Sequence, residues 1–220
     1  MKTALLFGAS GLVGSHILDQ LLADQYYDHI KVFARKPLQI NNKKVELITT
    51  NFLDISTYSD AISGDDCFFS IGTTGKITPD RAEFTRIEFT IPMDIANFAK
   101  KNSINSFLYV STMGANHKSF SLYLKNKGNV ENNLMDMQFS NLAIVRPSLL
   151  LGDRFSPRKD EQRYKKAFKL LNPLLIGGMR QYRPILAKIV AEAMINIAKN
   201  KTDQKIYKPI ELLSLASREI

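Results

Sequence analysis

Short apolar runs alternate along the chain with longer segments in which apolar residues recur every three or four positions. Such runs are typical of strands buried on both faces, and such segments are typical of amphipathic helices. The predicted strands are 3–7, 29–34, 45–49, 67–71, 106–111, 142–145 and a short one near 206. The predicted helices are 13–22, 81–100, 122–137, 164–171 and 185–199. This order predicts an α/β fold with a mostly parallel, doubly wound sheet covered by helices on both faces.

Proline and glycine refine this prediction in two places. Pro92 lies inside the predicted helix 81–100, where a missing N–H and a ring clash should kink or break it. Between 153 and 184 the pattern loosens among prolines and glycines. This segment follows the carboxyl end of a strand, where ligands bind in open α/β sheets, so we expect a loop-rich region that covers a substrate. With 220 residues and no composition break, we expect one domain over 1–220.

Composition excludes several classes of protein. No run approaches the roughly 20 apolar residues of a membrane span. The apolar run before Gly8 is too short for a signal peptide, which favours a cytoplasmic protein. The single cysteine, Cys67, lies in an apolar run and allows no internal disulfide. His16, His29 and His117 have no metal-ligand spacing, so we predict no metal site.

The formal net charge of +9 is concentrated late in the chain. The segment Arg154–Arg183 holds nine basic residues against Asp160 and Glu161. Such a segment is either a solvated face or a surface that attracts phosphate, nucleic acid or an acidic substrate. Nucleic-acid binding is the less favoured interpretation.

Three glycines follow the first predicted strand and open the first predicted helix. Residues 8–14 are Gly-Ala-Ser-Gly-Leu-Val-Gly, in the context that a dinucleotide site requires. The glycines allow close approach of backbone N–H groups to a pyrophosphate, and the helix N-terminus adds positive potential. The residues expected to bind the cofactor here are Gly8, Ser10, Gly11, Leu12, Val13 and Gly14.

The residues after the second strand indicate which nicotinamide cofactor binds. An NAD site usually has Asp or Glu there, whereas arginine accommodates a 2′-phosphate. This chain has Arg35 and Lys36, which favours NADP over NAD, although a basic pair on a loop is also consistent with solubility alone. After the fourth strand, Ile71, Gly72 and Thr73 should pass beside the ribose and the phosphates of the cofactor.

Tyr123 and Lys127 are four residues apart and share one face of the predicted helix 122–137. A free tyrosine has a pKa near 10, and a neighbouring ammonium lowers the pKa of a phenol by stabilising the phenolate. The pair can therefore transfer protons. A hydroxyl from Ser111 or Thr112, at the end of the fifth strand, could orient a substrate carbonyl.

Four motifs agree in order and spacing with those of a known family. They are Gly72-Thr73-Thr74, Ser111-Thr112-Met113-Gly114-Ala115-Asn116, Tyr123-Leu124-x-x-Lys127-Gly128-x-x-Glu131 and Arg146-Pro147-x-x-Leu150-Leu151-x-x-Arg154. With the glycine motif, they resemble the short-chain dehydrogenase/reductases, and more narrowly the atypical reductases related to the HIV Tat-interacting protein oxidoreductase. The resemblance covers about Lys2 to Lys169.

That resemblance implies a three-layer Rossmann fold that binds NADPH. It implies that Tyr123 is the catalytic tyrosine and that Lys127 is its partner. It also implies that the backbone at Leu150 and the side chain of Arg158 approach the cofactor. The family's usual Ser-Ser is Ser111-Thr112 here, so either hydroxyl remains a candidate.

Two functions follow from these residues and this resemblance. The first is an NADPH-dependent oxidoreductase that reduces a carbonyl or related group of an unidentified small molecule. The alternative is an NADPH-binding regulatory or protein-interaction module with little or no turnover. A protein partner and a homodimer both remain open.

Overall fold

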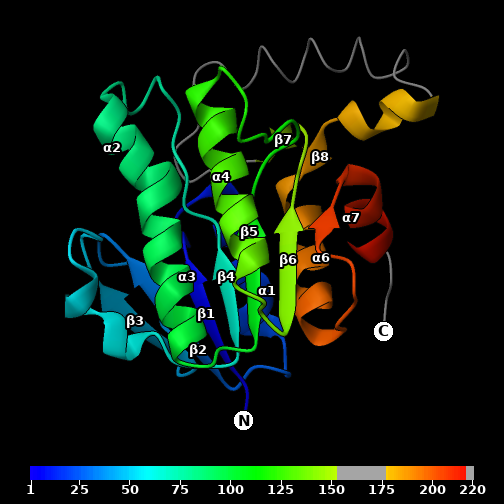
Figure 1. Cartoon of the computed structure of the whole chain (residues 1–220). Helices are drawn as coiled ribbons and strands as arrows, with labels where there is room; N and C mark the ends of the chain where they lie inside the picture. Colours follow the sequence, from blue (N-terminus) through cyan, green and yellow to red (C-terminus); the bar gives the residue numbers. More distant parts are fainter. Residues whose placement is uncertain (153–176, 217–220) are drawn as a thin grey trace.

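A seven-stranded parallel sheet lies at the centre of the computed structural model, which describes residues 1–152 and 177–216 (Figure 1). Its strands are β1 (Thr3–Phe7), β2 (His29–Ala34), β3 (Val45–Thr49), β4 (Asp66–Phe69), β5 (Ser106–Val110), β6 (Asn141–Val145) and β9 (Ile206–Tyr207). Their spatial order is β3-β2-β1-β4-β5-β6-β9, and every neighbouring pair is parallel. The order reverses between β1 and β4, which is where open α/β sheets bind their ligands.

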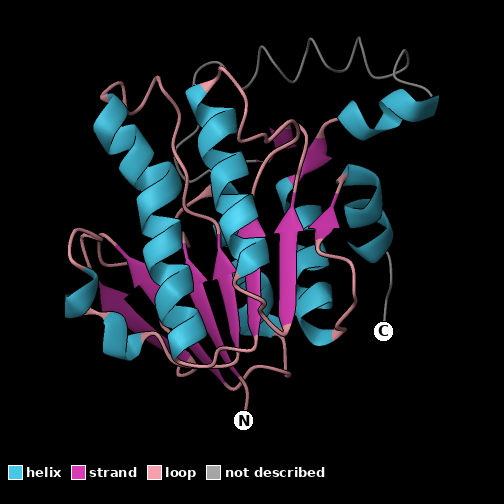
Figure 2. Cartoon of the chain, viewed as in Figure 1, coloured by secondary structure: helices cyan, strands magenta, loops and turns pink. Residues whose placement is uncertain are grey.

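Helices cover both faces of this sheet (Figure 2). One face carries α1 (Leu12–Ala23), α6 (Ala187–Lys199) and α7 (Pro209–Ala216). The other face carries α3 (Ile91–Lys101) and α4 (Leu122–Asp136), with α2 (Arg81–Thr85) leading into α3. The predicted fold class, a three-layer Rossmann-like arrangement, is confirmed.

Each face of the sheet has its own hydrophobic core, because successive side chains of a strand point to opposite sides. On β1, Ala4 and Leu6 belong to the core with α1 and α6, whereas Leu5 and Phe7 belong to the core with α3 and α4. All four side chains are fully buried. In the second core, the rings of Phe7 and Phe33 stack with centroids 4.2 Å apart. Burial on both faces explains the continuous apolar runs.

The predicted strands 3–7, 29–34 and 45–49 agree with β1, β2 and β3 at both ends. The fourth strand is Asp66–Phe69 rather than 67–71, because its pairing with β5 ends at Phe69. The start of the predicted helix 185–199 was wrong. Ile185–Leu186 is strand β8, which pairs with β7 (Leu150–Leu151), and α6 follows it. Two-residue strands are too short for a periodic pattern, and neither β7, β8 nor α7 was predicted.

Pro92 divides the long predicted helix as expected. Between α2 and α3 the chain forms a π-helical turn, Arg86–Thr90. Proline has no N–H, so the carbonyl of Glu88, four residues earlier, loses its helical donor. The N–H of Ile91 donates to the carbonyl of Arg86 five residues back, which is the π-helical pattern. Glu88 lies in this widened turn.

Three sequence expectations lie largely or wholly outside the described residues. They are the short helix 164–171, the loop-rich region 153–184 up to residue 176, and most of the basic segment Arg154–Arg183. Within 1–152 and 177–216, none of the helices combines the length and apolar character needed to cross a bilayer.

Replacing Phe107 tests the packing of the central strand β5. Its fully buried ring stacks on Phe69 and Phe139, with centroids 6.4 and 5.1 Å away. Phe107→Ala should lower the free energy of unfolding by about 3–5 kcal/mol in urea denaturation, because it leaves a cavity. The control Phe120→Ala, at a fully exposed ring, should change it by less than about 0.5 kcal/mol. Equal losses would contradict this core.

Candidate active site

The turn between β1 and α1 brings its backbone close to the carboxyl edge of the sheet. Gly8 has φ +97°, a conformation that favours glycine. A Cβ atom on Gly14 would lie 2.0 Å from the Gly8 carbonyl oxygen, and one on Gly8 would lie 2.8 Å from the carbonyl carbon of Ser70. The N–H of Gly11 closes the turn by donating to the Gly8 carbonyl at 2.8 Å. Helix α1 therefore starts directly against the ends of β1 and β4.

The amino end of α1 is suited to an anion. Its N-cap residue, Gly11, supplies no side-chain hydrogen bond, and the first turn contains no acidic residue. The N–H groups of a first helical turn lack intrahelical acceptors and carry positive potential. A pyrophosphate offers both acceptors and negative charge, so the residues present fit a dinucleotide.

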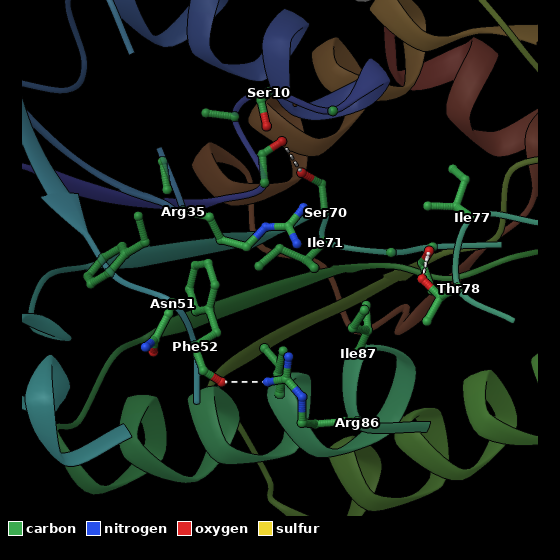
Figure 3. A pocket seen from close by; sticks show the side chains of 18 residues that line it. Ser10, Arg35, Asn51, Phe52, Ser70, Ile71, Ile77, Thr78, Arg86 and Ile87 are labelled. Atoms are coloured by element: carbon green, nitrogen blue, oxygen red, sulfur yellow. Dashed lines mark hydrogen bonds between the residues drawn. The ribbon is translucent and has the colours of Figure 1, made fainter. Parts of the chain in front are cut away.

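A cavity of about 230 Å³ opens beside this turn (Figure 3). Of the residues predicted to bind the cofactor, the cavity is lined by Gly8, Ser10, Gly11, Arg35, Ile71, Gly72 and Thr73. The other lining residues are Ala9, Phe33, Ala34, Asn51, Phe52, Ser70, Ile77, Thr78, Arg86, Ile87 and Ile91. Segments following β1, β2, β3 and β4 thus meet around one cavity, hereafter the nucleotide pocket.

Arg35 and Lys36 differ in their relation to this pocket. Figure 3 shows the guanidinium of Arg35 reaching into the nucleotide pocket from the end of β2. Lys36 is exposed and is not among the described residues that line it. A guanidinium can bind phosphate through two N–H groups at once. Arg35 is therefore the better-placed of the two for a 2′-phosphate.

Phe52 forms part of the pocket wall in a strained conformation. Its φ of +58° is uncommon for a bulky residue. Arg86 donates to the Phe52 carbonyl at 2.8 Å, and Glu83 holds the Arg86 guanidinium with hydrogen bonds of 2.7 and 2.8 Å. The Phe52 ring packs against Phe7 and Tyr58, with centroids 6.4 and 5.7 Å away. These contacts hold a fixed apolar ring at the pocket.

Lys127 projects from α4, and its ammonium group is buried. It is 3.1 Å from Glu88 Oε2, donates to the Val110 carbonyl at 3.0 Å and lies 4.7 Å from the ring centroid of Tyr109. Burial alone would lower the pKa of Lys127, but Glu88 and the phenols of Tyr109 and Tyr123 raise it above its usual 10.5. Lys127 is thus a buried cation at neutral pH.

Glu88 connects this cation to the nucleotide pocket. Its side chain is buried, with Oε1 accepting a hydrogen bond from the Thr73 N–H while Oε2 faces Lys127. A Cβ atom on Gly72 would lie 3.3 Å from Glu88 Oε1 and 3.9 Å from Lys127 Nζ. Gly72 and Thr73 line the pocket, so a single carboxylate bridges the pocket rim and the lysine.

Tyr123 lies one helical turn before Lys127 and is half-buried. Its ring meets Phe84 of α2 edge-on, with centroids 6.4 Å apart. Within 1–152 and 177–216, its hydroxyl has no hydrogen-bond partner, which leaves it available to a ligand. Gly128 sets the position of this helix, because a Cβ there would lie 2.3 Å from the backbone nitrogen of His117.

The two candidate hydroxyls after β5 have different surroundings. Ser111 is buried and donates to Glu131, which Arg146 also holds through hydrogen bonds from Nε, at 2.9 Å, and Nη2. Thr112 is half-buried, and its hydroxyl has no hydrogen-bond partner in the part of the chain that is described. Ser111 is therefore committed to a buried network, whereas Thr112 is available.

The remaining predicted site residues lie away from the pocket lining. Leu12, Val13 and Gly14 are buried in the first turn of α1, where their backbone is the relevant part. Leu150 is half-buried in β7. Arg158 lies outside the described residues.

Sequence reasoning missed Glu88 and Arg86 as members of the site. Glu88 carries a signal, because it is a single charge between Ile87 and Phe89 in a helix that a proline interrupts. Arg86 carries no sequence signal that distinguishes it from an ordinary solvent-exposed basic residue. In the described ranges, no three His, Cys, Asp or Glu side chains are grouped to hold a metal ion.

Comparisons with known proteins identify a family and several relatives that this chain resembles in sequence. The sequence model of a family described as "NAD(P)H-binding" matches residues 8–170. "Protein HTATIP2" of Rattus norvegicus is 30% identical over 201 residues, which cover 89% of this chain and 80% of that protein. "Protein FMP52, mitochondrial" of Debaryomyces hansenii is 28% identical over 209 residues, covering 92% and 90%. Its name assigns that relative to mitochondria, while a cytoplasmic location for this chain stays a prediction.

Solved structures resemble the fold over most of the chain. A UDP-N-acetylglucosamine 4-epimerase from Methanobrevibacter ruminantium M1 matches with a TM-score of 0.72 at 16% identity, covering 97% of this chain and 80% of that one. The enzyme WbmH from Bordetella bronchiseptica, in complex with NAD+, matches with a TM-score of 0.73 at 16% identity, covering 94% and 75%. At this identity the likeness concerns the fold.

Removing Lys127 tests the buried ion pair. Lys127→Met should lower the free energy of unfolding by about 3–5 kcal/mol, because the buried Glu88 carboxyl group is left without its ion-pair partner. Adding Glu88→Gln should recover most of this loss, since the amide is neutral and can still accept from Thr73. Urea denaturation of the two single variants and the double variant measures the coupling. Strictly additive losses would show that the two side chains do not interact.

Proposed function

Because the chain belongs to the NAD(P)H-binding family of Rossmann-fold proteins, among its atypical short-chain dehydrogenase/reductases, we propose that it is an NADPH-dependent oxidoreductase. It reduces a carbonyl or related group, with Tyr123 as proton donor and Lys127 as its partner. The observation that carries the proposal is the buried Lys127 ammonium beside Gly72, at the rim of the nucleotide pocket. A passive nucleotide-binding fold does not require a tyrosine and a buried cation there.

The backbone of the glycine turn and the amino end of α1 bind the pyrophosphate in this proposal. The φ of Gly8, the close approach at Gly14 and the uncapped helix support it. Arg35 binds the 2′-phosphate and makes NADPH the preferred cofactor. Its guanidinium in the pocket, together with the absence of a carboxylate at that position, supports this choice.

Tyr123 and Lys127 perform the proton transfer. Bound NADPH would supply the hydride to the carbonyl carbon. Tyr123 donates its phenolic proton to the carbonyl oxygen, which yields an alcohol, and water afterwards restores the phenol. Lys127 stabilises the transient phenolate by its charge and donates to a ribose hydroxyl. Thr112 orients the carbonyl oxygen, because its hydroxyl is available where that of Ser111 is engaged by Glu131.

Tyr123→Phe tests the proton donor. It should lower NADPH oxidation with a panel of aldehydes and ketones by about 10²–10⁴-fold, because only the proton-donating hydroxyl is removed. The dissociation constant of NADPH, measured by nicotinamide fluorescence, should stay within about twofold. Tyr26→Phe, at a half-exposed ring on the surface, serves as the control and should keep full activity.

The wild-type protein decides between the two functions. If it binds NADPH but turns over no member of the panel, the reductase proposal is contradicted and the regulatory module is favoured. Equal activity in Tyr123→Phe and the wild-type protein would reject Tyr123 as the donor.

Arg35→Ala tests the cofactor preference. The variant should weaken NADPH binding by about tenfold or more and leave NADH binding unchanged, because charge-assisted contacts to the 2′-phosphate are lost. Lys36→Ala should have a much smaller effect, since Lys36 does not line the pocket. Titration of each variant with both cofactors gives the comparison. Equal affinity of the wild-type protein for NADPH and NADH would overturn the assignment.

A further inference from the structure

We propose that Glu88 is a positioning residue, which keeps the Lys127 ammonium charged and directed toward the cofactor. The inference rests on the proposed function and adds a member to its site. Glu88 does not take part in hydride or proton transfer. It acts through Lys127 and through the Thr73 backbone at the pocket rim.

The charges around Lys127 single out Glu88. The π-helical turn contributes Glu88, β5 contributes the phenol of Tyr109, and α4 contributes the phenol of Tyr123. Among the described residues, Glu88 is the only carboxylate in contact with the ammonium. Both side chains are almost completely buried, so water and salt do not substitute for the missing charge. Without Glu88 the cation is desolvated and unpaired.

Hydrogen bonding around Lys127 points to the same role. An ammonium has three N–H groups. The Val110 carbonyl accepts one, at 3.0 Å, whereas Glu88 Oε2, at 3.1 Å, attracts the ammonium by its charge and accepts no hydrogen bond within the described residues. Both groups are fixed, since Val110 ends an interior strand and Glu88 is itself held by the Thr73 N–H. An N–H group of the ammonium therefore remains for a ribose hydroxyl to accept.

Glu88 also occupies a position that ties Lys127 to the pocket. Its Oε1 faces the Thr73 backbone on the pocket rim, and its Oε2 faces the Lys127 ammonium. Gly72 leaves space for this arrangement, because even a methyl group there would come within 3.3 Å of the carboxylate. A cofactor that moves the pocket rim therefore also moves the Lys127 ammonium, because Glu88 contacts both.

The pH dependence of NADPH binding tests the proposal. In the wild-type protein the dissociation constant should stay flat from about pH 7 to about pH 9.5, because Lys127 remains charged. Glu88→Gln keeps the size and the Thr73 acceptor but removes the charge, so burial should lower the pKa of Lys127. Its affinity for NADPH should fall by about tenfold across that range, as the charge-assisted hydrogen bond to the ribose is lost.

Two further variants separate positioning from general stability. Glu131 is a buried carboxylate one turn further along α4, and it forms an ion pair with the half-buried Arg146, which Glu131→Gln removes. This variant should leave the NADPH profile as flat as in the wild-type protein, because Glu131 does not contact Lys127. Glu88→Asp keeps the negative charge but holds it farther from Lys127. Its affinity for NADPH at alkaline pH should therefore fall less than that of Glu88→Gln. If Glu88→Gln does not fold, Glu88→Asn, which has the size of aspartate but no charge, replaces it, and a profile of Glu88→Asn parallel to the wild type contradicts the proposal.

The outcomes distinguish this inference from the function it rests on. A Glu88→Gln profile parallel to that of an NADPH-binding wild-type protein overturns the role of Glu88 and leaves the reductase proposal intact. Failure of the wild-type protein to bind NADPH contradicts the proposed function, and this inference with it. If the affinity for NADPH is independent of pH in the wild-type protein and falls at alkaline pH only in the Glu88 variants, the result supports both NADPH as the cofactor and Glu88 as a positioning residue.

Discussion

The buried ion pair between Glu88 and Lys127 is the interaction on which the candidate site depends. Removing two charges from water costs several kcal/mol per ion, and the Lys127 ammonium remains charged in this environment because the Glu88 carboxylate lies 3.1 Å away. Glu88 lies in the π-helical turn before Pro92, beside Gly72 and Thr73. Lys127 reaches the same carboxylate from α4, so the π-helical turn and α4 meet beside the nucleotide pocket.

The parallel sheet brings these groups together from distant parts of the sequence. Strand ends gather at one edge of a parallel sheet, and the order of this one reverses between β1 and β4. The glycine turn after β1, Arg35 after β2 and the Gly72 rim after β4 therefore surround one cavity. Strand β5 and helix α4 then deliver Thr112, Tyr123 and Lys127 to the adjoining side.

Much of the fold was accessible from sequence, whereas the partners within the site were not. Buried strands gave apolar runs at β1 and β2, whereas β3 was recognised although none of its side chains is fully buried. The glycine spacing indicated the turn before α1. The two-residue strands β7 and β8 have no period to detect. Whether Ser111 is free or bonded depends on Glu131 and Arg146, which reach it only through the tertiary fold. The same holds for Glu88, whose contacts come from other elements.

The central claim is that one bound dinucleotide spans the nucleotide pocket and reaches the buried lysine. The most direct measurement is a crystal structure of the protein with NADP+. The account predicts the pyrophosphate at the amino end of α1, the 2′-phosphate on Arg35, and a nicotinamide-ribose hydroxyl hydrogen-bonded to Lys127 Nζ while Glu88 still contacts it. A nucleotide bound elsewhere, or a ribose with no contact to Lys127, would contradict it.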